Sequence, residues 1–136
     1  MPARVHAEAK APHMAAVAVA AAAAGAAQIA TGYMPSTIAA AASPAVGAVW
    51  SLLLILGGVT VLVGAFMRPV ILGLRIEGSG HLGLAAGIIV YLLANVYWMN
   101  SPWWVSPAVW MPATVAIASL VRWFQIWLVF RSVRNV

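Results

Sequence analysis

Residues 67–81 read MRPVILGLRIEGSGH, a short charged island between two long apolar runs. The island holds three charged side chains, Arg68, Arg75 and Glu77, whereas the rest of residues 11–121 contains no Asp, Glu, Lys or Arg. Charged groups strongly favour water over hydrocarbon. The island is therefore predicted to be a loop outside the membrane, and the neighbouring segments take their orientation from it.

The two runs beside the island, Ala45–Phe66 and Leu82–Met99, are apolar over lengths that match a bilayer. As helices with a rise of 1.5 Å per residue they would be about 27–33 Å long, and a hydrocarbon core is about 30 Å thick. The chain of 136 residues is 65% hydrophobic and 7% charged, far from the composition of soluble domains. The predicted fold class is all-α, a polytopic membrane protein.

Two further stretches complete the predicted bundle. Residues 107–130 form the third strong span, and Arg122 lies inside it. The Ala-rich run of residues 14–31 is long enough to span, but alanine offers little apolar surface to lipid. Three interpretations stay open for it: a first transmembrane helix, a cleaved secretory signal, or a helix on the membrane surface. Residues 1–13 are predicted to be a polar leader, and residues 14–136 a single transmembrane helical domain.

Serine–proline pairs and glycines indicate helix starts and close contacts. The pairs at residues 43–44, 101–102 and 106–107 predict three helix starts, because proline fits the first turn, where its missing N–H costs nothing. Gly57 and Gly64 are seven residues apart and share one face of the span that follows the first pair. Small residues let a neighbouring backbone approach closely, so this face is predicted to pack against another helix.

Five residues are the predicted helix-packing and polar positions of the last two spans. Gly83, Gly87, Tyr91 and Asn95 follow one another at four-residue steps, so they share one face that should meet another helix. A buried amide in hydrocarbon needs a partner. The last two spans run antiparallel across a short turn, which puts Asn95 at the depth of Thr114, and the two side chains are predicted to bond.

Basic residues occur only at the ends of the apolar runs, which sets the predicted topology. Under the positive-inside rule the leader, the island and the C-terminus are cytoplasmic, with residues 32–43 and 100–106 outside. Both termini are then cytoplasmic if all four spans form. The residues counted are Arg4, Lys10, Arg68, Arg75, Arg122, Arg131 and Arg134.

Arg122 is the one charge inside a predicted span. Either its side chain reaches the interface along its methylene stem, which we favour, or it marks a functional site. Glu77 is the only acid beyond the leader, and it is predicted to face Arg122 or Arg75. Together with Arg68, these residues form the predicted set of interfacial charges.

The sequence lacks the residue groups of an enzyme active site. It has two acids, no cysteine and three histidines without metal-ligand spacing or a nucleophile partner, so no catalytic residue, cofactor or metal site is predicted. His81 is expected at an interfacial helix start. The basic residues form no patch with interleaved aromatics, so nucleic acid is not an expected partner. Small drug-efflux pumps depend on a membrane-embedded acid, and with Glu77 assigned to the island that class is set aside.

The run GLRIEGSGHLGLAAGIIVYLLA (residues 73–94), the later RWFQI (residues 122–126) and the basic tail resemble small membrane proteins encoded by phages of actinobacteria, some of which are treated as holins. The resemblance covers the chain from about residue 43 onward. It implies a protein of the host's inner membrane that self-associates and permeabilises the membrane for lysis. The expected partners are the lipid bilayer and further copies of the chain, and the alternative is an accessory subunit of a larger membrane complex.

Overall fold

The computed structural model describes residues 12–41, 43–98 and 106–134, and all regular secondary structure in these ranges is helical. The helices are α2 (Pro12–Thr31), α3 (Ser36–Ala41), α4 (Pro44–Phe66), α5 (Val70–Trp98) and α6 (Pro107–Arg134). Four of the described helices, all except the short α3, are long and apolar enough to cross a membrane. The chain is an all-α polytopic membrane protein, as predicted.

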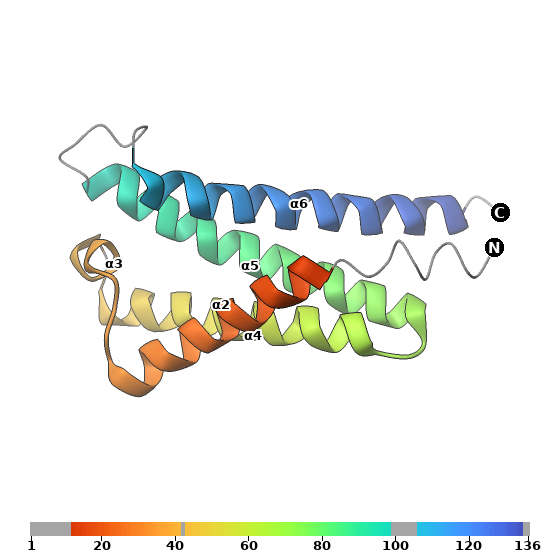
Figure 1. Ribbon diagram of the computed structural model, residues 1–136, viewed down its shortest axis with the longest axis horizontal. Coiled ribbons are helices and arrows are strands. Elements are labelled where there is room, and N and C mark those ends of the chain that lie inside the picture. Colours follow the sequence, from red (N-terminus) through yellow and green to blue (C-terminus); the bar gives the residue numbers. More distant parts are fainter. Residues whose placement is uncertain (1–11, 42, 99–105, 135–136) are drawn as a thin grey trace.

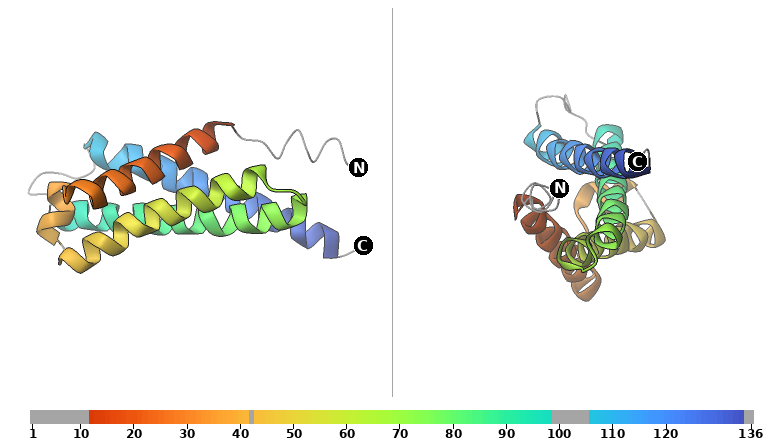
Figure 2. Two further views of the ribbon diagram at one scale, coloured as in Figure 1. Left: turned by 90° about the horizontal axis from the view of Figure 1, so that it is seen from below. Right: turned by 90° about the vertical axis from the view of Figure 1, so that its right-hand side faces the viewer.

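The four long helices pack in the order α2, α4, α5, α6, and this row curves when it is seen end-on (Figures 1 and 2). The central helices α4 and α5 make the largest contact, while α2 lies against α4 and α6 against α5. The start of α2, the α4–α5 turn and the end of α6 lie toward one end of the molecule, and α3 lies at the other (Figure 1). The row therefore leaves α2 and α6 as its two outer members.

Glycines bring the backbones of α4 and α5 into contact. A Cβ atom at Gly64 would overlap the backbone of Glu77, and one at Gly80 would lie only 2.6 Å from the amide nitrogen of Val61. At Gly57 a Cβ would lie 3.2 Å from the carbonyl oxygen of Gly80. Two helices can approach this closely only where side chains are missing. The close packing predicted for the face of Gly57 and Gly64 is confirmed.

The Ala-rich helix α2 packs against a second side of α4. A Cβ at Gly58 of α4 would overlap the carbonyl of Ala18, and one at Gly25 of α2 would lie 2.6 Å from the carbonyl oxygen of Ser51. Ala18 is fully buried with Val61 in a small apolar cluster. Among the three interpretations of residues 14–31, a transmembrane helix agrees with this packing, because α2 crosses α4 at an inclination (Figure 1) and is long and apolar enough to span.

The charged island is not a loop, so this prediction is wrong. Helix α5 begins at Val70 rather than at Leu82, and the connection from α4 takes only residues 67–69. A loop was expected because each charge was assumed to need water. Instead, Gly73 and Gly80 of the island contact α4, and the acid of the island has a partner inside the protein.

Two of the predicted serine–proline helix starts are confirmed. Helix α4 begins at Pro44 and α6 at Pro107, while the side chain of Ser43 makes no capping hydrogen bond. The pair at residues 101–102 lies outside the described residues. Proline thus marks the first turn here without help from the preceding hydroxyl.

Gly64→Ala is expected to destabilise the protein, because its new methyl group would meet the backbone of α5, which cannot move aside cheaply. Overpacking of this kind costs about 1–3 kcal/mol. Gly83→Ala is the matched control, since its Cβ would make an ordinary contact, 3.5 Å from the Cα of Gly57. Thermal unfolding in detergent measures both variants. Equal midpoints for the two would contradict the proposed backbone contact at Gly64.

Candidate functional site

An ion pair joins α5 to α6 inside the segments that could cross a membrane. The Nε of Arg122 donates to Oε1 of Glu77 at 2.8 Å, and the two residues are only 8% and 5% exposed. The prediction that Glu77 faces Arg122 is confirmed. The guanidinium of Arg122 is thus held by an acid on the neighbouring helix, while the level of this pair in the membrane stays a prediction.

His81 and Ser119 extend this pair into a group that we call the polar cluster, Glu77, His81, Ser119 and Arg122. His81 lies one turn after Glu77 on α5, and Ser119 one turn before Arg122 on α6. The Nε2 of His81 is 3.7 Å from Oε1 of Glu77, too far for a hydrogen bond. Both His81 and Ser119 are fully buried, and the prediction of a helix start at His81 is wrong, because α5 begins at Val70.

The polar cluster is only partly satisfied. Both ring nitrogens of His81 and the hydroxyl of Ser119 are buried without a hydrogen-bond partner. A buried polar atom left in this state costs about 1–3 kcal/mol. These groups would therefore gain free energy from any arrangement that brings them water or a bonding partner.

Glu77 also changes what the sequence excluded. The segment Val70–Tyr97 is long and apolar enough to cross a membrane, and it includes Glu77, which the sequence had assigned to a loop. Small drug-efflux pumps can no longer be set aside on that ground. Whether Glu77 is free to bind a substrate or already paired then decides if a transport role fits this protein.

The predicted packing face of α5 points at α4. The Nε1 of Trp50 donates to the carbonyl oxygen of Gly87 at 2.8 Å, and its ring stacks on Tyr91 with centroids 6.0 Å apart. Gly83 lies against Gly57 on the same side. Sequence reasoning missed the role of Trp50, although its spacing of seven residues from Gly57 places both on one face of α4.

The predicted bond between Asn95 and Thr114 is wrong. Asn95 is buried, as expected, but its Nδ2 donates to the carbonyl oxygen of Tyr91 at 2.9 Å in its own helix. Thr114 is exposed, and its hydroxyl donates to the carbonyl oxygen of Trp110 in α6. The amide satisfies its donor locally because its face is turned toward α4 rather than α6.

The remaining predicted interfacial charges are exposed. Arg68 lies in the turn after α4, and Arg75 lies in the first part of α5. The guanidinium of Arg75 is 5.4 Å from the ring centroid of Phe130, and that of Arg131 is 5.4 Å from the centroid of Trp127. The set of four predicted interfacial charges thus divides into two exposed arginines and one buried ion pair.

Within the described ranges, no three His, Cys, Asp or Glu side chains come together as a possible metal site. Comparison with known proteins gives no match, whether to protein-family models, to curated proteins or to solved structures. The polar cluster is therefore the candidate site on its chemistry alone, since ionisable groups inside a membrane span are costly and usually serve function.

Substitution of either member of the ion pair is expected to destabilise the protein more than substitution of both. Glu77→Gln or Arg122→Gln breaks the ion pair and leaves one of its two charges buried, which costs about 3–5 kcal/mol, whereas the double variant leaves neither charge. Arg122→Lys should lose less than Arg122→Gln, because it keeps the charge and loses only the planar fork. Unfolding in detergent gives the four values.

The matched control is Arg131→Gln, which removes an exposed arginine from the same helix and should change stability little. If the losses of Glu77→Gln and Arg122→Gln simply add in the double variant, the pair is not an interacting unit.

Proposed function

We propose that the protein is a non-enzymatic, self-associating membrane protein that permeabilises the membrane in the manner of a holin. The observation that carries the proposal is the polar cluster at the α5–α6 interface, inside helices that could cross a membrane. Polar and ionisable groups inside a span are costly and usually serve function. A protein that changes from a lipid-sealed to a hydrated state can use them to line water.

The outer surfaces of the long helices suit lipid and not water. The exposed side chains of α4, α5 and α6 are dominated by large apolar residues, for example Leu56, Leu93 and Ile117, and those of α2 mainly by alanines. A water path through the membrane therefore needs side chains that are now inside. Separation of α6 from α5 would expose the polar cluster, and hydration would then satisfy His81 and Ser119.

Self-association supplies a reason for that separation. Helices α2 and α6 are the outer members of the row, and each packs mainly against one neighbour. A helix of a second copy could pack against α6 in place of α5, or against α5 in place of α6. Such an exchange would preserve the packed area and open the original α5–α6 interface. The resemblance of residues 73–94 and 122–126 to phage-encoded membrane proteins supports the same role in lysis.

The state of Glu77 makes transport of cations the weaker function. Its carboxylate already accepts a bond from Arg122 at 2.8 Å. A cationic substrate would have to displace a guanidinium that has no other acid among the described residues. Displacement of the guanidinium would break this charge-assisted bond, which disfavours binding of a cation at Glu77.

The proposed location is the inner membrane of the host cell, with both termini in the cytoplasm. Arg68 and Arg75 lie at and just after the α4–α5 turn, and Arg131 lies near the end of α6. These segments share one end of the molecule (Figure 1). Retention of this basic end inside the cell follows the positive-inside rule.

The orientation can be tested cleanly because the chain has no cysteine. We expect a membrane-impermeant maleimide to label Ser36→Cys on intact cells and Met67→Cys only after lysis, since the two positions lie at opposite ends of the molecule. The same reagent on lysed cells controls for reactivity. Labelling of Met67→Cys on intact cells would invert the proposed topology.

Permeabilisation can be tested by inducing expression in cells suspended in a medium that contains a membrane-impermeant dye. The wild-type chain should admit the dye abruptly after a delay. Glu77→Leu/Arg122→Leu should fold, because apolar replacement of a buried pair is often neutral or stabilising, and should admit little dye, because the polar lining is gone. Arg131→Gln serves as the control and should behave as wild type.

Two outcomes would overturn this function. Equal dye entry with the double leucine variant would remove the polar cluster from the mechanism. Intact membranes with the wild-type chain, together with a co-purifying membrane protein, would favour the alternative of an accessory subunit in a larger complex.

A further inference from the structure

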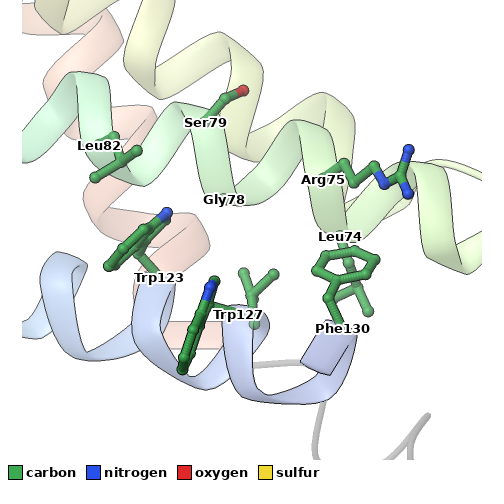
Figure 3. Close-up of a pocket in the computed structure, with 9 residues that line it drawn as sticks. Leu74, Arg75, Gly78, Ser79, Leu82, Trp123, Trp127 and Phe130 are labelled. Atoms are coloured by element: carbon green, nitrogen blue, oxygen red, sulfur yellow. The ribbon is translucent and has the colours of Figure 1, made fainter. Parts of the chain in front are cut away.

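A groove of about 250 Å³ runs between α5 and α6 beside the polar cluster (Figure 3). Its walls are mainly apolar and aromatic, and they include Leu74, Leu82, Trp123, Ile126, Trp127 and Phe130. Figure 3 shows the rings of Trp123 and Trp127 standing from α6 toward α5. The groove is open to the side of the helix pair, where a membrane protein meets lipid.

The depth of the groove depends on Gly78. A Cβ at this position would lie 3.6 Å from Cγ2 of Ile126 and 3.7 Å from Cδ1 of Trp123, so the fold would accept alanine here. The missing side chain therefore reflects no backbone contact of the kind seen between α4 and α5. Gly78 therefore contributes to the groove wall without a side chain of its own.

Two arginines are attached to the aromatic wall at the basic end of this groove. Arg75 lies over Phe130 and Arg131 over Trp127, each with its guanidinium carbon 5.4 Å from the ring centroid. Cation–π contact holds the charges at the wall without neutralising them. Glu77, the one acid in the described part of the chain, is bonded to Arg122. The described residues hold no other acid that could pair with Arg75 or Arg131, so both charges are available to an anionic ligand.

We propose that this groove binds one anionic phospholipid, with an acyl chain along the aromatic wall and the phosphate at Arg75, which lines the groove, while Arg131, held over the wall residue Trp127, adds a second positive charge. The level of the site fits such a ligand, because both arginines lie near helix ends at the same end of the molecule, where headgroups meet the spans. Arginine forms strong charge-assisted hydrogen bonds to phosphate. Basic pockets between transmembrane helices are known to select anionic headgroups.

A zwitterionic lipid satisfies the same site less well. Its ammonium group lies beside its own phosphate and reduces the attraction to two nearby cations. The two arginines therefore select an anionic lipid over a zwitterionic one. The apolar groove selects a lipid over a soluble phosphate, because only the lipid has an acyl chain to bind there. Both properties are separable by experiment, and neither depends on the permeabilising role.

The test measures the thermal midpoint of the purified full chain in a mild detergent after addition of phosphatidylglycerol, phosphatidylcholine or glycerol phosphate. Phosphatidylglycerol should raise the midpoint by roughly 3 °C or more, and the other two should raise it by clearly less. The gain should disappear in Arg75→Gln/Arg131→Gln. It should persist in Arg68→Gln, which removes an exposed arginine of the same end outside the groove.

A second variant tests the acyl chain. Leu82 is 42% exposed, so Leu82→Trp can be accommodated while it narrows the groove, and it should reduce the gain from phosphatidylglycerol with both arginines present. Equal gains from the two lipids, an equal gain from glycerol phosphate, or an equal loss in Arg68→Gln would each overturn the lipid site. Native mass spectrometry should show one retained anionic lipid per chain in the wild type.

Discussion

The organisation of this protein depends on the pairing of one acid with one base inside its helical domain. Glu77 and Arg122 are 45 residues apart in sequence, and a single bond at 2.8 Å joins them. Without Arg122, the helix that carries Glu77 would place an unpaired carboxylate inside a span, which is strongly unfavourable. Their pairing fixes α6 against α5 at one register. It also allows α5 to start near Val70 and to run without a break through the charged island.

The two faces of α5 are built by different means. Toward α4, missing side chains at Gly64, Gly73 and Gly80 let the backbones touch, and Trp50 adds a side-chain bond to the carbonyl of Gly87. Toward α6, the helix presents the polar cluster and an open groove. Contact between backbones leaves little freedom to slide or separate, whereas a partly satisfied polar interface beside a groove leaves more.

Local signals predicted the parts of the fold that local physics determines. The all-α class, the spans Ala45–Phe66 and 107–130, and the close approach at Gly57 and Gly64 required only hydropathy, proline position and periodicity. The start of α5 was missed because a charge next to apolar residues predicts water unless its partner is known. The spacings of Glu77 to His81 and of Ser119 to Arg122 do place polar groups on single helix faces. Which helix faces meet depends on the tertiary structure. The short turn predicted between the last two spans correctly indicated that α5 and α6 pack together, but the predicted contact between Asn95 and Thr114 was wrong.

This difference between the two faces bears on function. In a membrane the hydrophobic effect does not hold helices together, so packing and polar contacts decide which interfaces persist. The α4–α5 interface has dense packing and a satisfied indole bond, and separating it would create unfilled backbone grooves. The α5–α6 interface has one strong ion pair, and His81 and Ser119 gain partners only when the interface changes. If any interface of this row opens as copies assemble, physical reasoning selects α5–α6, and the side chains that it would release are the ones able to line water.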